Sequence, residues 1–463
     1  MSVLSTIFIV MFSLCEFYLI YNAILAVVAF FCPRPKYKMV DDKQKFCIFV
    51  PCHNEGSVIK ATVENYININ YDKNLFDIFF IADNCSDDTA KEIQNAINEN
   101  KIDNFYLFER NVDDPKKKGK PHALRWAIDK LEQDDKFYNK YDMFMILDAD
   151  NFVDPDILRH INSQYLSYKE NKRPVMIQTY LDSKNKNSLV ARSYYTAYRV
   201  TNRFFQLPHH SLGLNLAIGG TGFAMTTDFL KEIGGYNCQS LTEDLEIQSI
   251  ATLKGKRIVH NINTRVYDEK PTGVKQAYIQ RTRWAQGHWF LFFKYYILLF
   301  INLFNFKTIK STFRKIDQMI YLTSFLNVTL AFLTSIYGIV LACLNVPIPL
   351  PRPLLIFNLA VAIFYILLIP ISSLYDGTKQ EKKRILIDFL PNVISMFVLS
   401  YIIIFSAIRG LFLCGNQRTW AKTKHRVTEM EDGNASKANT IKSAKQVKVN
   451  SSPESELELE AQI

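Results

Sequence analysis

Three aspartates of this chain stand where apolar runs of the sequence end, and their carboxylates could do chemistry there. Asp83 ends the run that begins at Ile78, and Asp148 and Asp150 directly follow the run 143–147. If these runs are buried parallel strands, the carboxylates lie in the crevice where open α/β sheets bind ligands. Asp148 and Asp150 supply the hard oxygen ligands that suit Mg²⁺ or Mn²⁺ beside a phosphate. The alternatives are that the first motif is a helix cap, in which Ser86 or Asp87 accepts backbone N–H bonds, and that the Asp-X-Asp pair belongs to a plain turn.

A glycine-rich stretch at 219–223 precedes a second acidic motif, Thr242-Glu243-Asp244. Glycines such as Gly222 let a backbone approach a ligand closely, although glycine in an ordinary turn is the commoner explanation. Asp244 is the candidate general base, because transfer to a hydroxyl needs a carboxylate that takes the proton of that hydroxyl. We expect Gly222, Thr242 and Glu243 to contact the substrate beside it. The structural alternative is that this motif only begins a helix, whose N-terminus favours acidic residues.

A helical motif and a basic run add positive charge and aromatic surface. Gln280, Arg283 and Trp284 are spaced i, i+3 and i+4, so they share one helical face. Arginine suits phosphate oxygens, and tryptophan can cover the face of a sugar. Aromatic and basic residues also anchor helices at membrane interfaces, which is the simpler explanation of this motif by itself. Lys120 ends the basic run 116–120, which either gives one lysine to a diphosphate or is a solvated charge cluster.

Long apolar segments flank the part of the chain that carries these motifs. The segments 3–31, 318–345 and 353–374 are long enough to cross a bilayer as helices. Basic residues follow the first of them, so the positive-inside rule places the following domain on the cytoplasmic side. For the same reason we expect 288–306 to lie on the membrane surface and 386–413 to be interfacial or re-entrant.

Between the apolar segments, short apolar runs alternate with polar segments of helical length. This pattern predicts buried strands in an α/β layer fold. The expected divisions are an N-terminal transmembrane anchor at 1–32, the α/β domain at 43–285, interfacial and transmembrane helices at 286–415, a basic cytosolic segment at 416–426 and a disordered tail at 427–463.

The composition of the 463-residue chain argues against several other classes of protein. The eight cysteines form no Cys-X-X-Cys pair, which argues against a disulfide framework and against a thiolate zinc site. Lysines and arginines flank the apolar segments, so membrane topology explains the net charge of +10. A nucleic-acid-binding protein would need basic residues interleaved with exposed aromatic residues on one face, and the sequence has no such stripe. Nucleic acid is therefore not expected as a partner.

Taken together and in this order, the motifs resemble those of family 2 glycosyltransferases, specifically the membrane-embedded processive synthases of cellulose, hyaluronan and poly-N-acetylglucosamine. The resemblance implies a cytosolic GT-A domain, a Rossmann-like α/β fold that binds a UDP-sugar, fused to an α-helical transmembrane region. By similarity, Asp83 contacts the nucleotide, Lys120 contacts the diphosphate, and Asp148 and Asp150 contact the diphosphate and the metal. Asp244 is then the base.

The resemblance extends to the helical motif and to the basic segment near the C-terminus. Gln280, Arg283 and Trp284 are similar to the Q-x-x-R-W signature that holds the diphosphate and the acceptor end of the glycan. The stretch 420–424 is similar to the segment that closes over the donor in cellulose synthases. One departure is that many relatives carry Asp-Asp where this chain has Ala82-Asp83, so one nucleotide contact is absent or supplied by another residue.

The resemblance implies an inverting, processive enzyme that polymerises UDP-glucose into a β-linked extracellular polysaccharide and translocates it across the membrane. The partners are the UDP-sugar, the growing glycan and the lipid bilayer, with Mg²⁺ or Mn²⁺ as cofactor and a multi-pass location in the cell membrane. Two alternatives stay open: a poly-β-glycan synthase that uses UDP-N-acetylglucosamine, and transfer of one sugar to a lipid or polyprenyl phosphate. A transporter or scaffold with a degenerate domain would require the acidic motifs to be missing.

Overall fold

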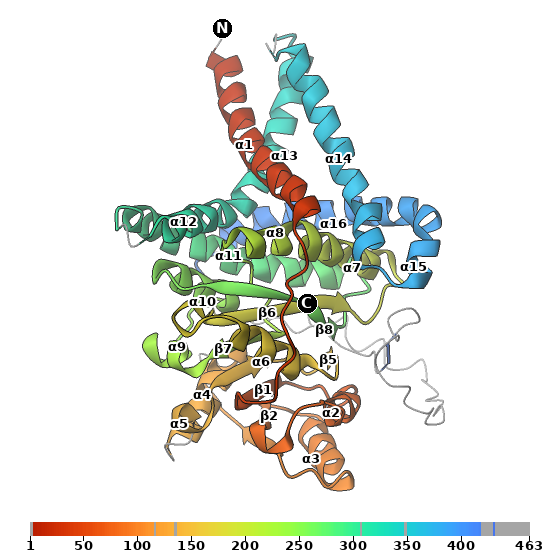
Figure 1. The fold of residues 1–463 in the computed structure, drawn as a ribbon. Coiled ribbons are helices and arrows are strands. Elements are labelled where there is room, and N and C mark those ends of the chain that lie inside the picture. The colour runs from red at the N-terminus through yellow and green to blue at the C-terminus, as the bar shows by residue number, and fades with distance from the viewer. Residues whose placement is uncertain are drawn as a thin grey trace.

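The computed structural model of the chain describes residues 3–114, 117–133, 137–305, 308–346, 350–417 and 429–430. Nearly all of the basic segment expected at 416–426, and of the tail expected at 427–463, lies outside these described residues. The described chain has an α/β domain at one end and a group of long helices at the other, as Figure 1 shows.

A single mixed sheet forms the centre of the α/β domain. Its strand order is β3-β2-β1-β4-β7-β6-β8-β5. The first four strands in this order are parallel to one another, β6 and β8 are parallel, and β7 runs antiparallel to both of its neighbours, β4 and β6. The strands are β1 (Phe46–Cys52), β2 (Phe76–Asp83), β3 (Phe105–Arg110), β4 (Met143–Ile146), β5 (Phe152–Val153), β6 (Met176–Ser183), β7 (Phe223–Thr226) and β8 (Ile258–Asp268).

Both faces of the sheet are covered by helices, which explains why its strands are continuous apolar runs. In β1, Phe46 and Ile48 pack into the core on one face, and Cys47 and Phe49 pack into the core on the other, as the two-residue period of a strand requires. The first core is completed by α2 (Ile59–Ile67), α3 (Thr89–Glu99) and α6 (Ile157–Ser167). The second is completed by α4 (Lys120–Glu132), α5 (Phe137–Lys140), α9 (Thr227–Glu232) and α10 (Glu243–Leu253).

The remaining helices lie on the membrane side of the molecule. Three of them rise together away from the sheet in Figure 1: α1 (Val3–Phe31), α13 (Ser324–Cys343) and α14 (Arg352–Asp376). Five others lie across their base, between them and the sheet: α7 (Leu189–Thr201), α8 (Leu207–Leu212), α11 (Val274–Asn302), α12 (Ile309–Leu322) and α16 (Ile385–Leu413). A π-helical turn (Asn202–Gln206) joins α7 to α8, and the short α15 (Lys379–Lys383) precedes α16.

Four helices of the described chain are long and apolar enough to cross a membrane: α1, α13, α14 and α16. The first three occupy segments that the sequence predicts as spans. The predicted span 318–345 is divided, however, because α12 ends at Leu322 and α13 begins at Ser324. At the start of the segment, Gln318 is buried and accepts from Nε2 of Gln248 in α10, a helix of the α/β domain. The adjacent Asp317 is buried between α8 and α1, where it bonds to His209 and accepts from the hydroxyl of Tyr21.

The segments 288–306 and 386–413 are each part of one continuous helix. Most of the first lies in the C-terminal half of α11, whose N-terminal half carries the Gln280 to Trp284 motif. The second is α16, which packs closely along α11: a Cβ atom added at Gly410 would lie 2.6 Å from Cβ of Ala285. Although α16 has the composition of a span, it lies across the base of the three rising helices in Figure 1.

Candidate active site

One cavity of about 750 Å³ lies between the sheet and the transverse helices, at the end of the sheet where β1, β2 and β4 terminate. The residues that the sequence singles out come from loops and helices distant in the chain, and the cavity brings them together. Every predicted site residue except Gly222 lines it, namely Asp83, Lys120, Asp148, Asp150, Thr242, Glu243, Asp244, Gln280, Arg283 and Trp284.

Asp83 ends β2 and is held by an arginine that the sequence motifs do not include. Arg110, the last residue of the neighbouring strand β3, donates from Nη1 to Oδ1 of Asp83 at 2.5 Å. The backbone N–H of Gly119 lies 3.4 Å from Oδ2 of Asp83, so this carboxylate also supports the loop that leads to Lys120. The N-cap of α3 is Asp88, whose side chain makes no capping bond, and Asp87 before it accepts from the N–H of Thr89, the first residue of the helix.

Lys120 begins α4 and links three parts of the site. Its Nζ lies 2.5 Å from Oδ1 of Asp148, 2.7 Å from the carbonyl oxygen of Gly220 and 3.8 Å from Oε1 of Glu243. Burial by itself would lower the pKa of Lys120, but Asp148 and Glu243 outweigh this effect and raise the pKa above its usual value. Lys120 is therefore a cation fixed at the Asp-X-Asp motif, where it can meet a phosphate oxygen.

The Asp-X-Asp motif is a tight turn after β4, with one carboxylate accessible and one buried. The side chain of Asp148 is 39% exposed, and its backbone N–H donates to Thr221 and to Asn151. Asp150 is buried, and its Oδ2 accepts from the backbone N–H of Glu269 at 2.7 Å. The carbonyl oxygen of Asp150 accepts from Nζ of the buried Lys184 at 3.0 Å.

The glycine that approaches the reactive residues is Gly220, not the predicted Gly222. Gly222 lies in the sheet layer, where its carbonyl oxygen accepts from Oγ1 of Thr179 at 2.7 Å. Gly220 has a φ of +75°, and a Cβ atom added there would lie 3.2 Å from Oδ2 of Asp244. Because the motif contains several glycines, the sequence cannot tell which one faces the cavity.

Glu243 and Asp244 are the first residues of α10, as the structural interpretation of their motif also expects. Glu243 is buried, and the N–H of Leu245 donates to Oδ1 of Asp244. Burial raises the pKa of Glu243 to about 7 against the lowering effect of Lys120, and burial likewise raises the pKa of Asp244. A carboxylate with a raised pKa is a stronger base, so Asp244 has both the place and the basicity to accept a proton.

The helical motif lines the cavity from α11. Among the described residues, Oε1 of Gln280 is buried in the cavity wall without a hydrogen-bond partner. Glu243, Asp148 and Asp244 all act on the pKa of Arg283, which burial lowers, so the guanidinium lies within the field of these carboxylates. Lys120 and Arg283 are thus both cations close to Asp148, Glu243 and Asp244.

Trp284 lies on the side of the cavity that faces the transverse helices. Its ring packs edge-on against Tyr194 of α7, and the guanidinium of Arg281 lies over both rings at 4.6 and 4.5 Å. Beyond Trp284 the lining becomes apolar, with Leu399 and Ile403 contributed by α16. The interfacial-anchor interpretation of the motif therefore holds only in part, because the same residues line the cavity.

Sequence reasoning missed a second charged group in the cavity, at the end of β8. Nζ of the buried Lys270 lies 2.5 Å from Oδ1 of Asp268 and 3.5 Å from the ring centroid of Tyr198. Burial raises the pKa of Asp268 to about 6, although Lys270 opposes this. Asp268 ends β8 as Asp83 ends β2, but polar residues such as Asn261, Asn263 and Arg265 interrupt β8, so no apolar run in the sequence marks this strand end.

The chain belongs to the glycosyltransferase family 2: the model of this family, described as "Glycosyltransferase like family 2", matches residues 43–287. The α/β domain is accordingly a GT-A domain with a mixed, Rossmann-like sheet, fused to a helical region with membrane-span candidates. The chain is thus a member of a glycosyltransferase family, and four of its described helices are long and apolar enough to cross a membrane.

Individual relatives are distant. Poly-beta-1,6-N-acetyl-D-glucosamine synthases of Staphylococcus aureus strains are 26% identical over 248 residues, which is 54% of this chain and 55% of theirs. The match thus spans about half the length of these relatives. A "probable glycosyltransferase" of Sulfolobus acidocaldarius is 25% identical over 379 residues, 80% of this chain and 75% of that one.

Among solved structures, a mannosyltransferase from Pyrobaculum calidifontis, in complex with GDP-Man and Mn²⁺, has the same fold. Its TM-score is 0.55 at 14% sequence identity, and the match covers 85% of this chain and 99% of that one. The match therefore extends beyond the α/β domain.

Proposed function

We propose that this protein is an inverting, processive glycosyltransferase that builds a β-linked glycan from a UDP-sugar and passes the product across the membrane. The observation that carries the proposal is the composition of this cavity. Lys120 and Arg283 suit a diphosphate, and Asp148 suits a metal bound to that diphosphate. The same cavity is also lined by apolar residues of α16 and by Phe325 of α13. A donor site and a path toward the membrane helices are thus continuous.

In this mechanism Asp244 takes the proton of an acceptor hydroxyl. The hydroxyl oxygen then attacks the anomeric carbon from the face opposite the diphosphate, so a new C–O bond forms as the bond to the diphosphate oxygen breaks. The electron pair of the broken bond leaves with UDP, and Lys120 and Arg283 stabilise the charge that develops there. Attack from the opposite face inverts the anomeric centre, which gives a β-linkage from an α-linked donor.

The residues after β4 fit a divalent cation. Mg²⁺ and Mn²⁺ usually bind through one or two carboxylates together with substrate phosphates. Asp148 and Asp150 both line the cavity, and Nζ of Lys120 already shows that a cation is stable against Asp148. No group of three or more His, Cys, Asp or Glu side chains that could hold a metal ion is found in the described part of the chain. The chemistry of a bound cation would be to neutralise the leaving group.

The donor that we propose to test first is UDP-N-acetylglucosamine. The sequence pattern favours UDP-glucose, but the Staphylococcus aureus relatives are named for a polymer of N-acetylglucosamine. The two sugars differ at one substituent, so either fits a mechanism that depends on the anomeric carbon and the diphosphate.

We propose that the α/β domain is cytoplasmic. Arg34, Lys36 and Lys38 directly follow α1, and α15 with Arg384 adds positive charge between α14 and α16. Both basic segments lie at the ends of apolar helices that face the α/β domain, and such segments stay on the cytoplasmic side.

Purified protein in vesicles, given radiolabelled UDP-N-acetylglucosamine and UDP-glucose in parallel with Mn²⁺ or Mg²⁺, tests the proposal. We expect label from one donor in material of high molecular weight that a linkage-specific β-glycosidase degrades. Label found only in small or lipid-extractable products would contradict polymerisation and support transfer of a single sugar to a lipid or polyprenyl phosphate.

A further inference from the structure

The segment 183–186, which we call the strand-end segment, joins the end of β6 to the approach to α7 and supports two parts of the cavity at once. Lys184 donates from Nζ to the carbonyl oxygen of Asp150 at 3.0 Å. Asn185 holds the backbone of Lys270 by a pair of bonds: its Oδ1 accepts from the N–H of Lys270 at 2.8 Å, and its Nδ2 donates to the carbonyl oxygen at 3.0 Å. The segment therefore fixes the backbone beneath both an acidic and a basic residue of the cavity.

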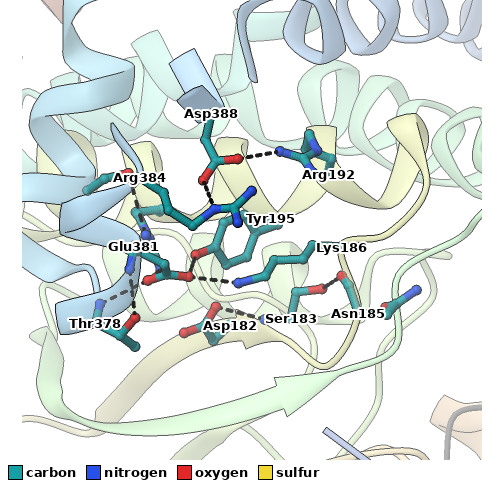
Figure 2. A network of polar contacts seen from close by, with 12 residues as sticks. Asp182, Ser183, Asn185, Lys186, Arg192, Tyr195, Thr378, Glu381, Arg384 and Asp388 are labelled. Atoms are coloured by element: carbon teal, nitrogen blue, oxygen red, sulfur yellow. Dashed lines mark hydrogen bonds and ion pairs between the residues drawn. The ribbon is translucent and has the colours of Figure 1, made fainter. Parts of the chain in front are cut away.

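The same segment is held from the membrane side by one ion pair, which Figure 2 shows. Lys186 reaches away from the cavity, and its Nζ lies 2.9 Å from Oε1 of Glu381 in α15. Lys184 and Asn185 thus bond residues that line the cavity, and the next residue, Lys186, bonds the connection between α14 and α16.

Glu381 is itself fixed by several groups. Its Oε2 accepts from Nη2 of the buried Arg199 at 2.9 Å, and the hydroxyl of Tyr195 donates to its Oε1. Thr378 and Glu381 form a reciprocal capping box that sets the turn into α15. Burial raises the pKa of Glu381, but Arg199 and Lys186 outweigh it and hold the pKa well below its usual range, so this carboxylate stays charged at neutral pH.

We infer that Lys186 and Glu381 are positioning residues for the donor site: their ion pair holds the strand-end segment, and through it Asp150 and Lys270, in the arrangement that binds the donor diphosphate. The inference rests on the proposed function, because it takes the donor to bind beside Asp150. Residues that orient the groups of a site from behind commonly contribute as much to affinity as some direct contacts.

The sharpest test is the Lys186→Met variant, because it breaks the link and leaves Glu381 paired with Arg199. We expect KM for the UDP-sugar to rise about tenfold, and UDP to bind about tenfold more weakly in a direct binding assay with Mn²⁺, with kcat within about twofold of wild type. The thermal unfolding midpoint should stay at the wild-type value, because Lys186 is partly exposed. Lys186→Arg, which keeps the ion pair, should restore KM.

Two further variants complete the experiment. Asp388→Asn is the matched control: it breaks pairs with Arg192 and Arg384 in the same network, and KM should not change. Glu381→Gln breaks the Lys186 pair from its other end, so the inference can be tested on whichever variant folds. A Lys186→Met or Glu381→Gln protein that folds and binds UDP as wild type does would overturn the inference. Wild-type protein that binds no UDP would instead contradict the proposed function, and the inference with it.

Discussion

In the proposed mechanism the acceptor side of the chemistry depends on Asp244, whose carboxylate lies against Gly220 and beside the buried Glu243. Replacing Asp244 by Asn removes the base and keeps the shape of the side chain, so kcat should fall by about 10²–10⁴-fold while UDP binding remains. Single-turnover transfer and UDP binding, measured on the same preparation, check this. Asp228→Asn is the control, because Asp228 also stands in the first turn of a helix but is exposed; it should leave kcat unchanged.

The pH dependence of transfer follows from the same pair. Burial raises the pKa of both Glu243 and Asp244, and the base works only when it is deprotonated. Transfer should therefore fall as the pH drops, with the acidic limb of kcat/KM closer to neutrality than the value of about 4 for an ordinary carboxyl. Because adjacent groups titrate together, the limb belongs to the pair. A profile that stays flat down to pH of about 4.5 would contradict the assigned base.

At the scale of single residues, the motifs predicted the cavity well but not the partners inside it. Residues chosen for their chemistry and spacing, such as Lys120 and Arg283, do line one cavity. The pairing of Asp83 with Arg110 was not predictable, because it depends on two strands ending side by side. Gly222 was chosen by composition; Gly220 and Gly222 both have a positive φ, but only Gly220 lies against Asp244.

At the scale of elements, α11 and the loop before α10 meet at a glycine. A Cβ atom added at Gly287 would lie 2.5 Å from Oγ1 and 2.8 Å from the backbone nitrogen of Thr242. Gly287→Ala must therefore push back the loop that carries Glu243 and Asp244, at a cost of about 1–3 kcal/mol. We expect a lower thermal unfolding midpoint and a lower kcat.

The control for this prediction is Gly273→Ala, at the N-cap of the same helix. Its φ is −111°, and an added Cβ atom would meet no heavy atom within 4 Å. Thermal unfolding and transfer rates of the two variants should therefore differ. Equal behaviour would mean that the contact between α11 and Thr242 has no bearing on catalysis.

The sequence pattern predicts which elements are buried. It does not predict the direction of a strand or the position at which a helix ends. The apolar runs correctly predicted β1, β2 and β4, but β7 is equally apolar and runs antiparallel to β4. Likewise 318–345 is apolar enough to be expected as one span, whereas Gln318 of α12 bonds to Gln248 of α10 in the α/β domain, and α12 ends at Leu322. Such tertiary contacts cannot be read from hydropathy.

At the scale of the whole molecule, the cysteines offer a test of topology. All eight are free, and Cys343 is exposed at the last residue of α13, the end farthest from the sheet in Figure 1. With a cytoplasmic α/β domain, a membrane-impermeant maleimide should label Cys343 in intact cells. Cys343→Ser should stay unlabelled until the cells are permeabilised, when the half-buried Cys85 of the domain becomes accessible. Labelling of the Cys343→Ser variant in intact cells would contradict a cytoplasmic α/β domain and indicate the opposite orientation in the membrane.

The single helix α11 has a consequence for how the enzyme responds to its surroundings. It runs unbroken from Val274 to Asn302, about 43 Å at 1.5 Å per residue, with Arg283 in its first half and exposed apolar residues such as Ile297 and Ile301 in its second. A stiff rod of this kind transmits displacement along its whole length. If the apolar end lies at the bilayer surface, as the sequence predicts for 288–306, a tilt of that end also tilts the guanidinium of Arg283, which would couple bilayer thickness and lateral pressure to the geometry of the cavity.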